Sequence, residues 1–242
     1  MTRNLSKQIA VVAVALALIG GIALASKSQP ATSTRYITVS ADGTVKVTPD
    51  AVRLNATITT VQGSSKAALA STSTSTNAVR AALIANGVAT KDIATQNLTV
   101  YPEYSYSQNK SPVITGYRGS QSIEVVIHNT KNAGTIVDAV VAAGGNKLQI
   151  DGVTPFVFDA TAASSSARTD AVQKAKAKAS SYASLMNLKL GKVNSLIENS
   201  SPTAYPVPMT DAMSASAGAR ATKIDLGQQD VTISITIQWA LQ

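Results

Sequence analysis

The chain has 242 residues, no cysteine and one histidine, and it carries a formal net charge of +8 at pH 7. The absence of cysteine excludes disulfides, thiol catalysis and thiolate metal sites. This length suffices for one sizeable domain or two small ones, and a mild positive charge suits an environment of anionic polymers or lipid headgroups.

The N-terminal segment, residues 1–25, has the pattern of an export signal. A basic start precedes an apolar run over residues 9–25, and Ala23 and Ala25 occupy the small-residue positions that a signal peptidase reads. We expect cleavage after Ala25. The alternative is a retained anchor formed by residues 9–25, because the run is only slightly short for a membrane span. Either alternative predicts an exported protein that is periplasmic, secreted or displayed at the cell surface.

A polar linker over residues 26–34 leads into one predicted domain over residues 35–242. Apolar and polar residues alternate through residues 35–47 and again through residues 51–61, which is the period of half-buried strands. We therefore expect the domain to begin with two strands that follow each other closely.

Two turn signals mark these strands. The Asp42-Gly43 pair predicts a turn or bulge inside the first run. Pro49 and Asp50 join the two strands, because proline fixes a backbone angle suited to the first turn position and aspartate caps turns through its side chain. A catalytic carboxylate is the alternative for Asp50, but no second carboxylate stands nearby in the sequence to share acid–base work. We interpret Asp50 as a turn former.

Three segments have the periodicity of helices, over residues 65–86, 131–143 and 160–187. In the first, the residues expected to face inward are Leu69, Thr72, Thr76, Val79 and Leu83. In the second, they are Ile136, Val137, Val140 and Val141. In the longest, a narrow stripe of mostly small residues consists of Ala163, Ala167, Ala171, Ala175, Ala179, Tyr182 and Met186.

The remaining segments are predicted strands and a loop. The strands are expected over residues 92–107, 116–129, 148–159, 191–199 and 230–241. A mobile tip is expected over 105–113, and a long flexible loop over 200–227, which is rich in Ser, Ala and Pro. The order β-β-α-β-β-α-β-α-β-β, with hairpin neighbours and intervening helices, indicates an α+β fold with a mostly antiparallel sheet.

Four stretches in this order and spacing resemble the SIMPL-domain family of exported bacterial proteins, over residues 36–241. They are ITVSADGTVKVTPDAVRLNATI, LIANGVATKDIATQNLTVYPEYSY, GYRGSQSIEVVI and AVQKAKAKASSYASLMNLKLGKV. The positions that match the family signature are Gly43, Pro49, Asp50, Gly116, Tyr117, Arg118 and Gly191. The chain departs from the family at Ala41, where a first glycine often stands, and at Gly119, where alanine is usual.

The resemblance implies export, a link to the cell envelope and to oxidative-stress tolerance, and no catalytic residue that can be carried over. The residues agree with that limited picture. His128 is the only imidazole, and a strand-end histidine is the simpler interpretation than a member of a triad. We expect no metal site and no cofactor, because the acidic residues are scattered and no phosphate-binding motif is present. Nucleic acid is not an expected partner, because aromatic residues are sparse and the chain is exported.

Two surfaces are candidates for contact with a partner. The first is the alanine stripe at Ala171, Ala175 and Ala179, which favours homo-oligomeric assembly or docking on an envelope protein. The second is the hairpin 101–117 with Tyr104 and Tyr106, which favours a binding module for a small ligand or cell-wall polymer; cross-strand packing explains the tyrosines equally well. The lysines of the long helix suggest either a solvated face or contact with anionic lipid or wall polymer. We expect a non-enzymatic protein.

Overall fold

The structure, a computed structural model, describes residues 35–108, 111–199, 203–207 and 222–242. Three helices and eight strands lie in the described residues: β1 (Tyr36–Val47), β2 (Ala51–Gln62), α2 (Ser65–Ala85), β3 (Ile93–Ser105), β4 (Val113–Ile127), α3 (Ala133–Gly144), β5 (Leu148–Phe156), α4 (Thr161–Leu185), β6 (Leu190–Glu198), β7 (Thr203–Val207) and β8 (Gln228–Leu241). This confirms the α+β class and the predicted order of elements. The predicted leader and linker lie outside the described residues.

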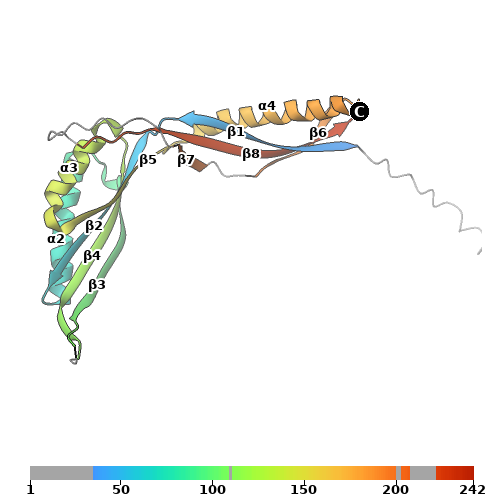
Figure 1. Cartoon of the computed structure of the whole chain (residues 1–242). Coiled ribbons are helices and arrows are strands. Elements are labelled where there is room, and N and C mark those ends of the chain that lie inside the picture. The colour runs from blue at the N-terminus through green and yellow to red at the C-terminus, as the bar shows by residue number, and fades with distance from the viewer. Residues whose placement is uncertain (1–34, 109–110, 200–202, 208–221) are drawn as a thin grey trace, which may run out of the picture. The chain divides into compact units, whose positions relative to one another are not determined.

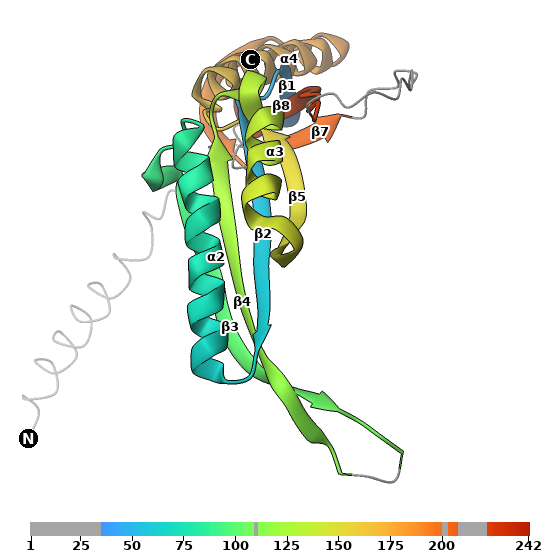
Figure 2. The same cartoon turned by 90° about the vertical axis from the view of Figure 1, so that its left-hand side faces the viewer.

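The strands form two antiparallel sheets (Figures 1 and 2). The first sheet has the order β3-β4-β2-β5, and the second has the order β1-β8-β6, with β7 paired to β8 beyond the end of β6. Part of the segment predicted as a loop is therefore strand β7, which pairs Thr203 with Thr232 and Val207 with Gln228. Local composition does not reveal this strand, because its backbone partners come from β8. Residues 200–202 and 208–221 of the predicted loop lie outside the described residues.

Each sheet buries one face under helices, and the strand alternation decides which face. In β2, Val52, Leu54, Ala56 and Ile58 are fully buried under α2 and α3, as the period of two requires (Figure 2). In β8 the same alternation buries the apolar residues Val231, Ile233, Ile235, Ile237 and Trp239. The second core is completed by the alanines of α4, which pack against β8 and β1.

Most of the residues predicted to face inward are buried, including Val79 and Leu83 of α2 and Ile136, Val137 and Val140 of α3, but four bulky residues are not. Leu69, Val141, Tyr182 and Met186 are all more than 40% exposed. In α2, Ala68 is buried in place of Leu69. A Cβ atom added to Gly119 of β4 would lie 2.9 Å from the Ala68 carbonyl oxygen, so the helix approaches the strand closely here. Only a small residue fits at such a close approach.

The stripe of α4 keeps a spacing of four residues to its end, because Ala183 is buried in place of Tyr182 and Met186. A spacing of four residues advances about 40° around a helix of 3.6 residues per turn. The line of contact therefore winds around α4 and follows the twist of the strands beneath it.

The two sheets differ in how completely they are covered. A helix is about 10 Å wide and strands lie about 4.8 Å apart, so one helix covers roughly two strands. The first sheet has four strands with two helices, whereas β1, β8 and β6 share α4 alone. Most of β6 is consequently exposed, including its apolar residues.

Candidate interaction surfaces

The side chain of Asp50 connects two segments that are distant in the sequence, so its role extends beyond a local turn. Its two carboxylate oxygens accept hydrogen bonds from the backbone N–H groups of Phe158 (2.6 Å) and Asp159 (3.3 Å), just before α4 begins. Pro49 beside it is buried. The carboxylate of Asp50 therefore fixes, through hydrogen bonds, the backbone that leads into α4. This use agrees with a structural role and gives the carboxylate no acid–base partner.

Glycine is required at position 43 because a side chain would not fit beneath α4, and not because the backbone turns there. Strand β1 runs without interruption from Tyr36 to Val47, and Gly43 has no positive φ, so the predicted turn or bulge at Asp42-Gly43 is wrong. A Cβ on Gly43 would lie 1.9 Å from the carbonyl oxygen of Ala167 and 2.4 Å from the amide nitrogen of Ala171. The glycine allows the backbone of α4 to cross directly over the strand.

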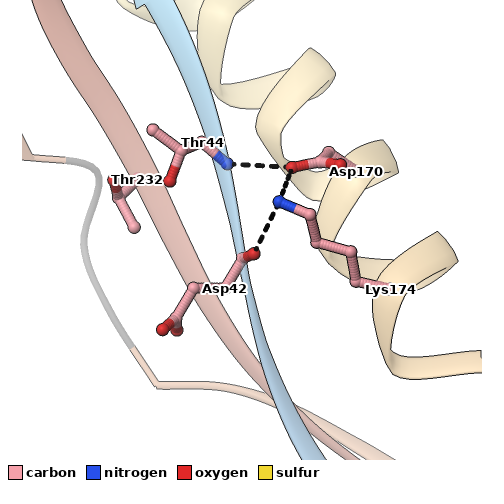
Figure 3. Close-up of polar contacts among 5 residues, drawn as sticks. All are labelled: Asp42, Thr44, Asp170, Lys174 and Thr232. Atoms are coloured by element: carbon pink, nitrogen blue, oxygen red, sulfur yellow. Dashed lines mark hydrogen bonds and ion pairs between the residues drawn. The ribbon is translucent and has the colours of Figure 1, made fainter. Parts of the chain in front are cut away.

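The outer edge of β1 is closed by side chains of α4 (Figure 3). The Asp170 carboxylate accepts a hydrogen bond from the Thr44 backbone N–H (3.1 Å), and the Lys174 ammonium donates to the Asp42 carbonyl (3.4 Å) and to Asp170 (2.7 Å). The hydrogen bond from Lys174, followed by that from the backbone N–H of Thr44, lowers the pKa of Asp170 below its ordinary value. A capped edge is protected against pairing with another strand.

The alanine stripe is an internal packing surface, which corrects its assignment as a contact surface for partners. Ala171, Ala175 and Ala179 are fully buried against β1 and β8 of the same chain. Their small size serves the close approach of α4 to the sheet. Periodicity alone could not decide between an internal and an external partner, because both require the same small residues.

The opposite flank of α4 faces an open groove. The groove has a volume of about 580 Å³, with Val172, Lys176 and Ser180 of α4 on one side. Its remaining lining residues are Leu190, Gly191, Val193 and Leu196 of β6 and Ile237 and Trp239 of β8. Because Val193 pairs with Trp239 and Leu196 with Ile237, these β6 side chains share the helix-covered face of the sheet, yet both are more than half exposed.

Gly191 lies where β6 leaves regular register with β8. A Cβ on Gly191 would lie 2.9 Å from the Ala240 carbonyl oxygen. The pairing of β6 with β8 shifts between Leu190 and Val193 and again before Ser195. Arg168 of α4 pairs with Glu198 at the end of β6, and its hydrogen bond lowers the pKa of Glu198.

The β3–β4 hairpin extends beyond the rest of its sheet. Pairing of β2 with β4 ends at Tyr117, whereas β3 and β4 remain paired out to Ser105 and Val113. We call residues 102–108 and 111–116 the β3–β4 ribbon. It projects past the end of α2 in Figures 1 and 2.

The signature residues Gly116, Tyr117 and Arg118 lie at the base of this ribbon. Gly116 is buried beside the end of β2, and the Arg118 guanidinium pairs with Glu103 across the strands. Further out, four side chains are between 46% and 77% exposed: Tyr104, Tyr106, Val113 and Ile114. The rings of Tyr104 and Tyr106 lie 6.4 Å apart, so they form one patch.

His128 lies at the end of β4, with its Nε2 atom 3.6 Å from an Asp92 carboxylate oxygen and its ring edge-on to Phe158. Within the described ranges, the interactions of the His128 side chain are those with Asp92 and Phe158, so it has no serine partner of the kind a triad requires. No group of three potential metal ligands occurs within the described ranges. Within the same ranges no helix is long and apolar enough to cross a membrane, and residues 9–25 lie outside them.

Sequence reasoning did not find the groove. The apolar residues Val193 and Leu196 were part of a predicted strand, but nothing local indicates that the face they share with Trp239 is uncovered. A signal was nevertheless available, because the predicted elements already included more strands than three helices can cover.

Comparison with known proteins agrees with the sequence motifs. The model of the SIMPL family, described as a protein of unknown function (DUF541), matches residues 37–239. The chain is 28% identical over 231 residues to the 26 kDa periplasmic immunogenic protein of Brucella melitensis, covering 91% of this chain and 90% of that protein. It is 32% identical over 132 residues to the uncharacterized protein YggE of Escherichia coli, covering 54% of this chain and 52% of YggE. A YggE protein of Edwardsiella ictaluri is 26% identical over 151 residues, or 61% of each chain.

Proposed function

This chain belongs to the SIMPL family, and we propose that it is a non-enzymatic exported protein that acts by associating with a second copy of itself through the β3–β4 ribbon. Location in the periplasm is supported by the name of the Brucella relative and by the leader pattern of residues 1–25. The family description names no activity. Oxidative-stress tolerance, if the chain contributes to it, would follow indirectly from assembly, because the chain has no cysteine to react with an oxidant.

One observation carries the proposal: the ribbon exposes Tyr104, Tyr106 and Ile114 on one face, and no described helix covers that face. A two-stranded ribbon is at best marginally stable in water without packing against another element. Contiguous exposed apolar residues on such an element are typical of protein interaction sites. The ribbon therefore gains stability if a partner covers the face formed by Tyr104, Tyr106 and Ile114.

A second copy supplies a matching surface. Two ribbons related by a two-fold axis bring the same apolar residues together, which is the usual geometry of a homodimer contact. The edge of β1 is less available to a second copy, because Asp170 and Lys174 bind the Thr44 backbone N–H and the Asp42 carbonyl oxygen on that edge.

Light scattering after gel filtration tests the proposal. The protein purified from the exported fraction is expected to form a discrete multimer. Replacing Tyr106 and Ile114 together by serine is expected to release monomers without changing the circular dichroism spectrum, because both side chains are exposed on the same face. Leu185→Ser is the matched control, because Leu185 is also highly exposed but lies at the end of α4. A monomeric wild-type protein at micromolar concentration contradicts the proposal.

The alternative function, a binding module for wall polymer, uses the same tyrosines. The Tyr104–Tyr106 patch favours it, because aromatic faces provide broad, rigid contact area. A monomeric protein that is retained on wall material, and that loses retention when both tyrosines become alanine, would support this module in place of assembly.

A further inference from the structure

The groove between α4 and β6 has the size and the lining of a small-ligand site. Its volume of about 580 Å³ falls within the roughly 300–1,000 Å³ that ligand pockets occupy. Its floor is formed by Ile237 and Trp239, and its outer wall by Val193 and Leu196 of β6. The lining is thus mainly apolar, with Lys176 and Ser180 as its polar side chains.

The groove is too narrow for a further helix. It exists because α4 lies over β1 and β8, which leaves one uncovered strand with a width of about 5 Å. A helix is about 10 Å wide and would need two uncovered strands. The stretch of β6 from Leu190 to Leu196 extends over about 20 Å, and it is exposed from residue 192 onward. A long and thin apolar molecule fits these dimensions.

Lys176 supplies the charge that selects the ligand. The other cations of α4 are engaged: Lys174 with Asp170, Lys178 with the Ser40 carbonyl, and Arg168 with Glu198. In contrast, Lys176 has no hydrogen bond or ion pair within the part of the chain that the structure describes. Ser180 lies one helical turn further along the same wall, and no acidic residue lines the groove.

We propose that this groove binds a single-chain anionic amphiphile, such as a long-chain fatty acid. The alkyl chain lies along β6 over Trp239, and the carboxylate accepts hydrogen bonds from the Lys176 ammonium and the Ser180 hydroxyl. One ammonium group with one neighbouring hydroxyl matches a single carboxylate, and the apolar walls match the alkyl chain. This site is separate from the β3–β4 ribbon and does not depend on how the ribbon functions.

Trp239 makes the test direct, because it is the only tryptophan of the chain and lies at the floor of the groove. The protein purified from the exported fraction is titrated with bromine-labelled palmitate below its micelle concentration, and tryptophan quenching is recorded. We expect saturable quenching. The correspondingly labelled alcohol, which lacks the carboxylate, should bind about ten-fold more weakly, the factor expected for one charge-assisted hydrogen bond.

Three variants locate the ligand. Lys176→Gln should raise the dissociation constant for palmitate by about ten-fold. The matched control Lys178→Gln should leave it unchanged, because Lys178 contacts the opposite flank at β1. Leu196→Glu, at an exposed position that the fold tolerates, should abolish the quenching.

Quenching that never saturates would overturn the proposal, and so would quenching that survives Leu196→Glu. Equal affinity for acid and alcohol, or equal effects of the two lysine variants, would overturn the assignment of Lys176 as the carboxylate partner. The double variant of the ribbon should bind palmitate like the wild-type protein, which separates this test from that of the proposed function.

Discussion

Adding one methyl group at Gly43 should destabilise the second sheet strongly. In Gly43→Ala the new Cβ would lie 1.9 Å from the Ala167 carbonyl oxygen, whereas ordinary contacts begin at 3.4 Å, so α4 or β1 must move by about 1.5 Å. The atoms that must move belong to a helix backbone and not to a flexible side chain. We therefore expect a loss at the upper end of the overpacking range, about 3 kcal/mol in the free energy of unfolding.

This loss is measurable by thermal unfolding followed by circular dichroism. For a chain of this size it corresponds to a decrease of roughly 6–12 °C in the melting midpoint. The matched control is Gly152→Ala in strand β5, where a Cβ would meet no atom within 4 Å; we expect a change within about 0.5 kcal/mol. Gly43→Asn separates close approach from turn chemistry, because asparagine suits a turn but is larger than alanine. A Gly43→Asn protein as stable as the wild type would refute the close-approach account.

Two further predictions concern carboxylates. Asp50→Ala should lower the free energy of unfolding by about 1 kcal/mol, because two backbone N–H groups before α4 lose their acceptor; an unchanged urea midpoint would show that water replaces the carboxylate without loss. The pKa of Asp170 is lowered in the folded state, so folding favours the charged carboxylate. The stability that this carboxylate contributes is complete above the ordinary pKa of 3.8. It is lost as the pH falls below 3.8 and through the lowered pKa of the folded state. Asp170→Asn should therefore flatten the acid limb of the melting midpoint against pH, and an acid limb identical to that of the wild type would contradict the assignment.

Much of the fold follows from local patterns in the sequence. Alternation in β2 and β8 identified the strands and their buried faces, because the period of two is a property of an extended backbone. The 3.6-residue period located the three helices to within a few residues. The family assignment rested on signature residues such as Gly43 and Arg118, which the sequence displays directly.

The roles of those residues, however, depend on contacts that no local pattern contains. The partner backbone of Asp50 lies 108 residues away, and the reason for Gly43 is a helix more than 120 residues further along the chain. The alanine stripe of α4 indicated a close partner, but only the tertiary structure shows that the partner is the chain's own second sheet.

The groove at β6 shows most clearly which features follow from local sequence patterns and which depend on tertiary contacts. The sequence by itself predicted that Val193 and Leu196 belong to a strand and that Lys176 belongs to the long helix. Only the tertiary structure decided that α4 crosses over β1 and leaves β6 uncovered. The physical reason is that a helix covers about two strands, so the place of the uncovered strand depends on which pair the helix packs against.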